Sequence, residues 1–197
     1  MRFSKRRLIV VFLLFILLDG CAAYLVPETK DPKDKLSLAR SLINTGRPLP
    51  AEKLINESIE IYSRENNMAM LGEAYWLYGM LEYGFPKGND KTKKTAIEYY
   101  EKALKYFNEY FTKVSYNNDD RYYANHYFDA SSSAMYLGDS YDPEIDRDKA
   151  CKSYDLSIKY NKIGMEIKPN AKINVPKGFP NFKEFIISKQ VKAKCLN

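Results

Sequence analysis

Apolar residues recur at steps of three and four along most of the chain, a spacing that places them on one face of an α-helix. Three segments share a finer pattern: a small residue, a large apolar one four positions later, and a small one after three more. These segments are Ala51-Ile55-Ser58, Ala96-Tyr100-Ala103 and Ala150-Tyr154-Ser157. Small side chains let a neighbouring helix approach, and the large side chain fills the gap beside it. The pattern therefore predicts closely packed helices.

Turn-forming residues divide the periodic stretches into seven expected helices. Gly46 ends the first, Pro50 is placed to open the second, and the loops at 84–90, 115–119 and 141–146 separate the later ones. A last helix is expected after Asn181, beyond an irregular stretch at 169–180. The helix at about 68–83 is apolar on nearly all sides, so it should be the most buried. Because no strand pair is indicated, the expected fold class is all-α.

One helix pair carries the best copy of a known motif. Leu137, Gly138 and Tyr141 are followed, after eight residues, by Ala150 and Tyr154. This resembles the tetratricopeptide repeat, whose pattern is W-x2-L-G-x2-Y and then A-x3-F. The resemblance implies antiparallel helix hairpins stacked as a short α-solenoid, closed here by a C-terminal helix.

Two weaker copies precede the best one. The middle copy has Gly79 and then Ala96-Tyr100-Ala103, with a longer connecting loop that is more similar to the Sel-one-like variant of the repeat. The first copy has Ala39 in the glycine position. The resemblance spans about residues 35–165, and a helical domain without repeats is the alternative.

The start of the chain is predicted to be an export signal. Four of the first seven residues are cationic, and eleven uncharged apolar residues follow at 8–18. That run is too short to span a bilayer, which takes about 20 residues. Leu18-Asp19-Gly20-Cys21 resembles the lipobox of bacterial lipoproteins, from which Asp19 departs. The alternative is an ordinary signal peptide with an incidental cysteine.

The lipobox resemblance implies that Cys21 is the lipidation site and the first mature residue. It divides the chain into a removed signal peptide at 1–20, a tether at 21–34 and a helical domain at 35–197. Ala22, rather than an aspartate, follows the cysteine and implies sorting to the outer membrane. The predicted location is therefore the periplasmic face of that membrane, with contact through the lipid only.

Charge and cysteine content further restrict the mature protein. The first 20 residues hold four basic residues and one acidic residue, which leaves 27 basic and 24 acidic residues. This balance gives no basis for nucleic-acid binding. Cys151 and Cys195 remain as a pair in a compartment that oxidises thiols, so a disulfide is predicted. Because sequence gives no distance between them, two unpaired buried thiols are the alternative.

No pattern predicts catalysis, a metal site or a cofactor. His126 is the only histidine, and no serine stands in a nucleophile-elbow context beside it. The alternating acids at 142–148 resemble a calcium loop, but Arg147 and Ser153 stand where an EF-hand needs Gly and Glu. Negative charge at a helix N-terminus explains these acids better.

In the tetratricopeptide family the first helix of each hairpin lines the concave face. Carried over by position, the resemblance implies a protein-binding groove there. Its residues would be Arg40, Glu73, Trp76, Met80, Tyr83, Met135 and Asp139, beside Lys33, Leu36 and Ser132. Trp76 is the sharpest candidate because it is the sole tryptophan, and a core position is its alternative.

An anchor, a groove and no catalytic pattern together predict a non-catalytic protein-binding module in the bacterial envelope. One role is an adaptor in assembling a pilus or secretion apparatus, similar to repeat-bearing lipoproteins that chaperone secretins. Another is an immunity lipoprotein that binds and neutralises a toxin delivered to the periplasm, such as a phospholipase effector of a contact-dependent secretion system. An envelope enzyme, the third class, is disfavoured. The expected partner is a protein, of an identity that the sequence leaves open.

Overall fold

The computed structural model describes residues 28–85, 90–114 and 122–196. Within these ranges all regular structure is helical, which confirms the all-α fold class. The helices are α2 (Pro32–Asn44), α3 (Pro48–Arg64), α4 (Met68–Gly84), α5 (Asp90–Lys113), α6 (Tyr123–Ser140), α7 (Arg147–Ile167) and α8 (Phe182–Lys192). The predicted signal peptide and Cys21 lie outside the described residues.

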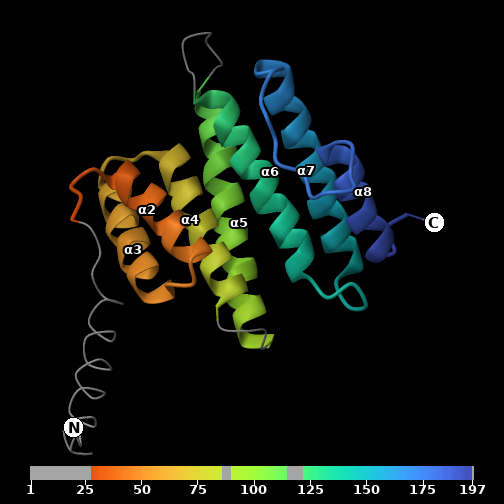
Figure 1. The fold of residues 1–197 in the computed structure, drawn as a ribbon, viewed down its shortest axis with the longest axis horizontal. Helices are drawn as coiled ribbons and strands as arrows, with labels where there is room; N and C mark the ends of the chain where they lie inside the picture. The colour runs from red at the N-terminus through yellow and green to blue at the C-terminus, as the bar shows by residue number, and fades with distance from the viewer. Residues whose placement is uncertain (1–27, 86–89, 115–121, 197) are drawn as a thin grey trace, which may run out of the picture.

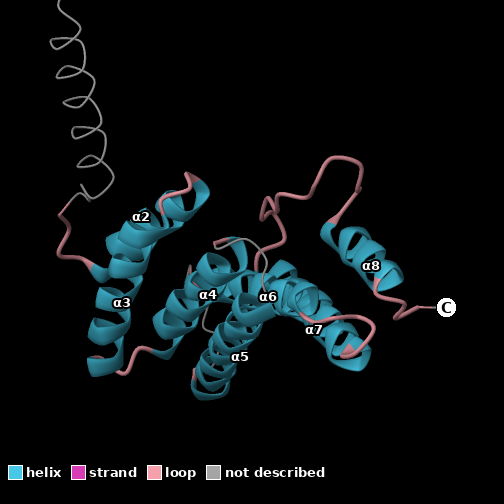
Figure 2. Ribbon diagram, turned by 90° about the horizontal axis from the view of Figure 1, so that it is seen from below, coloured by secondary structure: helices cyan, strands magenta, loops and turns pink. Residues whose placement is uncertain are grey.

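Consecutive helices pack as three antiparallel hairpins, α2 with α3, α4 with α5 and α6 with α7 (Figure 1). Figure 2 shows α2, α4, α6 and α8 along one side of the molecule and α3, α5 and α7 along the other. The first row is curved, with α2 and α8 standing at its ends. The arrangement is consistent with a short α-solenoid, as the sequence predicted.

A glycine on one helix and an aromatic ring on the next explain the close packing within two hairpins. A Cβ atom on Gly79 would lie 2.5 Å from the ring of Tyr100, and one on Gly138 would lie 2.6 Å from the ring of Tyr154. No side chain larger than hydrogen fits at either place without movement. These are the glycine and aromatic positions of the repeat pattern, so the pattern marks where α4 meets α5 and where α6 meets α7.

Two helices begin earlier than the sequence indicated. Helix α2 starts at Pro32, where the Asp31 side chain accepts a hydrogen bond from the backbone N–H of Lys33. The tether predicted to extend to residue 34 therefore ends before this cap. Helix α3 starts at Pro48 rather than Pro50, because a proline in the first helical turn loses no intrahelical hydrogen bond.

Helix α4 is buried on nearly all sides, as predicted, with nine buried residues that include Leu77 and Trp76. It contacts helices of all three hairpins, namely α2, α3, α5 and α6. This central position explains why its sequence lacks a polar face. Helix α4 therefore fixes the spacing between the first and second hairpins.

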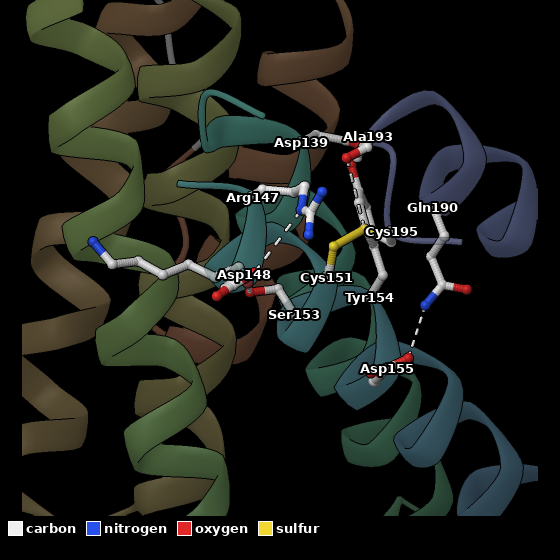
Figure 3. Close-up of a disulfide and its surroundings, with 11 residues drawn as sticks. Asp139, Arg147, Asp148, Cys151, Ser153, Tyr154, Asp155, Gln190, Ala193 and Cys195 are labelled. Carbon is white, nitrogen blue, oxygen red and sulfur yellow. Dashed lines mark hydrogen bonds and ion pairs between the residues drawn. A yellow bond between two sulfur atoms is a disulfide. The ribbon is translucent and has the colours of Figure 1, made fainter. Parts of the chain in front are cut away.

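A disulfide attaches the C-terminal segment to the last hairpin. Cys151 on α7 and Cys195 after α8 are bonded, with their Cα atoms 5.5 Å apart, which confirms the predicted pairing. Figure 3 shows Cys195 meeting Cys151 beside Tyr154. Ile186 of α8 is fully buried, in one apolar cluster with Met135, Ala150 and Tyr154. Helix α8 therefore covers the end of the stack.

Candidate functional site

A cavity of about 630 Å³ opens between the first helices of the three hairpins. We call it the α2–α4–α6 groove. It is lined by Lys33, Ser37 and Arg40 of α2, Asn67, Ala69, Met70 and Glu73 around the start of α4, Tyr110 of α5, and Tyr122, Asn125, His126, Phe128 and Asp129 around the start of α6. Because each hairpin contributes its first helix, the groove exists only in the assembled stack.

Three charged side chains, one from each hairpin, meet in this groove. Arg40 Nη2 donates to Glu73 Oε1 at 2.9 Å and lies 3.8 Å from Asp129 Oδ1. The Arg40 side chain is 38% exposed, whereas those of Glu73 and Asp129 are only 19% and 18% exposed. Two largely buried carboxylates therefore share a single guanidinium, which is more exposed than either of them.

This arrangement disfavours the charged form of Asp129. Burial first, and then the negative charge of Glu73, raise the pKa of the Asp129 carboxyl to about 7 against the opposing effect of the Arg40 guanidinium. A carboxylate in such surroundings gains more from an added cation than a solvated one does, because water screens it less.

The indole ring of Trp76 packs against the guanidinium of Arg40. The guanidinium carbon lies 4.5 Å from the centroid of the Trp76 ring, within the range of a cation–π contact. Trp76 is only 6% exposed and is not among the residues that line the groove, so its expected place in the groove wall is wrong. It is a core residue, the alternative that the sequence left open, and it positions the arginine.

Aromatic and apolar side chains form the rim and walls of the groove. Tyr122 is 54% exposed, and the Lys33 ammonium lies 3.8 Å from its ring centroid. His126 meets Tyr110 edge to face at 5.2 Å between ring centroids. Met70 and Phe128 complete the apolar lining. A partly apolar wall beside a few charged groups is typical of protein-binding grooves.

Two of the predicted groove residues lie in a separate cavity. Tyr83 and Asp139 line a pocket of about 370 Å³ at the edge of α8. There Lys189 Nζ of α8 bonds to both Asp139 carboxylate oxygens, at 2.9 and 2.7 Å, and Tyr154 donates its hydroxyl to Asp139 at 2.9 Å. The Asp139 carboxylate is therefore already paired with a lysine of the protein's own C-terminal helix.

The remaining predicted groove residues pack into the interior. Met135 is 9% exposed and belongs to the cluster beneath α8, and Leu36 is 1% exposed. Met80 is partly buried against the main core. These residues share a helix with groove residues, but they point towards a neighbouring helix. Placing all of them in one open groove was wrong for this reason.

Sequence reasoning missed Asp129, which completes the charged cluster. It lies three residues before Ser132, which had been assigned to the concave face, so one more helical turn on the same face leads to it. The missing information was that α2 and α6 lie close enough for Arg40 to reach both acids.

The described residues show no group of three or more His, Cys, Asp or Glu side chains placed to hold a metal ion. None of the helices in that part of the chain is long and apolar enough to cross a membrane.

Comparisons with known proteins found no match for this chain among protein-family models, curated proteins or solved structures. The resemblance to tetratricopeptide and Sel-one-like lipoproteins rests on the residues quoted above and stays a prediction.

Proposed function

We propose that this chain is a non-catalytic lipoprotein of the bacterial envelope that holds a protein partner in the α2–α4–α6 groove. Its role would be that of an adaptor in the assembly of an envelope machine such as a pilus or secretion apparatus. The observation that carries the proposal is the convergence of Arg40, Glu73 and Asp129, from three hairpins, in one lined groove.

The groove has the composition that protein interfaces favour. Tyr122 and Met70 offer large apolar contacts, and the charged cluster offers directional hydrogen bonds. Curved helical stacks commonly bind partners along their concave side. The lipobox resemblance at Cys21 adds a membrane anchor, and two or more acyl chains are enough for stable attachment.

Site-specific photo-crosslinking in living cells tests this proposal. A photoreactive phenylalanine derivative would replace Met70 or Ser37, both of which line the groove. Lys159, an exposed residue of α7 in the other row of helices, provides the control position. We expect one discrete crosslinked protein from each groove position and none from Lys159.

The identity of the crosslinked protein defines the role. A pilus or secretion component would support the adaptor role. An exported toxin would instead indicate an immunity role. If both groove positions give the same background as Lys159, the groove is not a binding site and the proposal fails.

A further inference from the structure

We propose that the partner segment in the α2–α4–α6 groove presents a lysine or arginine whose charged group lies between Asp129 and Glu73. This inference rests on the proposed function and adds the chemistry that the groove selects. Three features support it. They are the two acids and one guanidinium at the floor of the groove, the pairing of another α6 aspartate with a lysine, and the apolar wall of the groove.

The floor of the groove holds two carboxyl groups, those of Glu73 and Asp129, and one guanidinium, that of Arg40. Glu73 takes the short hydrogen bond from Arg40, so Asp129 is left with the same guanidinium at 3.8 Å, beyond hydrogen-bond distance. Lys33, the other cation that lines the groove, is exposed at the rim and lies over Tyr122. Its charge is therefore screened by water, whereas the two acids are largely buried.

Helix α6 carries a second largely buried aspartate, and that one is paired with a lysine. Asp139 on α6 is 15% exposed, close to the 18% of Asp129, and Lys189 of α8 bonds to both of its carboxylate oxygens. Helix α8 lies in the same row as α2, α4 and α6 (Figure 2). Lys189 thus pairs with Asp139 from another helix of the same row. Asp129, ten residues earlier and about 15 Å away along the helix, has no such lysine among the described residues.

The walls of the groove suit the rest of a basic side chain. Lysine and arginine carry an apolar stem that packs on apolar surface while the charged end reaches a partner. Met70, one helical turn before Glu73, is among the lining residues, and Tyr122 stands exposed at the rim. A cavity of about 630 Å³ has room for such a side chain together with its neighbours.

Selection from random peptides tests the inference without a known partner. A phage-displayed library of short random peptides would be selected on the detergent-solubilised mature lipoprotein with its disulfide intact. Peptides that crosslink to the photoreactive residue at position 70 would be kept. We expect a lysine or arginine at one constant position in these peptides.

Affinity measurements then locate the acid that reads the basic residue. Asp129→Asn keeps the shape of the side chain and removes its charge, and should weaken binding of a selected peptide roughly tenfold or more. Replacing the basic residue of the peptide with norleucine should cost about as much, and combining the two changes should cost little more than either alone. Glu60→Gln, at a position 73% exposed on α3, should leave the affinity unchanged.

The outcomes separate this inference from the proposed function. Groove-crosslinked peptides without a constant basic residue, or with equal affinity for wild type and Asp129→Asn, overturn the inference and leave the groove as a binding site. A library that yields no groove-crosslinked peptide overturns both.

Discussion

Arg40 on α2 donates a hydrogen bond to Glu73 on α4, with 2.9 Å between Nη2 and Oε1. The two residues are 33 positions apart in the chain, so this contact joins the first hairpin to the second. Asp129, at 3.8 Å from the same guanidinium, adds the third hairpin. The charged cluster is therefore both the floor of the groove and a link between the repeats.

The first prediction concerns the titration of Asp129. Burial raises the pKa of its carboxyl from 3.8 to about 7 in the folded chain, so the folded state keeps a proton that the unfolded state releases. The stability gained from this proton is fully present below about pH 4 and is lost as the pH rises through about 7. Asp129→Asn does not titrate. It should therefore raise the free energy of unfolding at pH 8 by about 1–3 kcal/mol relative to wild type.

Urea unfolding of both proteins at several pH values measures this difference. The advantage of the variant should shrink as the pH falls towards 4. Glu60→Gln, an exposed change on α3, should give a constant difference near zero. A variant advantage that is the same at pH 5 and pH 8 would show that Asp129 has an ordinary pKa.

The second prediction concerns the close contact within the middle hairpin. Gly79→Ala would place a Cβ atom 2.5 Å from the ring of Tyr100, which is fully buried and has little room to move. Overpacking of this kind costs about 1–3 kcal/mol of unfolding free energy. Gly84→Ala, at the end of the same helix with no atom within 4 Å, should be neutral or slightly stabilising. Thermal melting of the two variants checks the contrast, and equal melting temperatures would contradict it.

The fold could be predicted from local patterns because its packing is local. The Gly79–Tyr100 and Gly138–Tyr154 contacts each lie within one hairpin, and the spacing of small and large residues along the sequence predicts close packing there. The loops hold enough turn-forming residues to separate the helices. The disulfide was predicted from the count of cysteines in a chain expected to be exported, and the structure added the Cα–Cα distance of 5.5 Å.

The groove could be predicted only in part because it depends on contacts between hairpins. The tetratricopeptide resemblance, carried over by position, named Arg40 and Glu73, and both line the cavity. It could not show that Trp76 lies beneath Arg40, that Met135 is covered by α8, or that Asp139 is already paired with Lys189. These contacts depend on the angle between hairpins and on where α8 packs. Neither can be predicted from a short stretch of sequence.

The third prediction concerns the membrane anchor. If Cys21 carries the lipid, Cys21→Ser should abolish incorporation of labelled palmitate, and the signal should remain uncleaved by the lipoprotein peptidase. Cys195→Ser, which breaks the disulfide and leaves Cys21 unchanged, should keep the label. Palmitate in the Cys21→Ser protein would place the anchor elsewhere.

The fourth prediction concerns the attachment of α8. This helix has only two buried residues, Ile186 and Gln190, and Gln190 donates a hydrogen bond to Asp155 at 2.7 Å (Figure 3). So small a contact holds a helix weakly, and the disulfide across 44 positions adds roughly 4 kcal/mol at best by the chain-entropy model. Reduction should therefore let α8 open long before the stack unfolds.

Hydrogen exchange with and without reductant tests the attachment of α8, because it reports opening helix by helix. We expect amides of α8 to lose protection at least tenfold on reduction, since the cross-link no longer limits local opening. The amides of α4 should change little, because that helix is buried on nearly all sides and lies away from the disulfide. The Cys151→Ser variant should behave like the reduced protein, with or without reductant. If α8 stays equally protected in the oxidised protein, the reduced protein and the variant, its contacts with Asp139 and Asp155 suffice to hold it, and the disulfide is not what keeps the end of the stack closed.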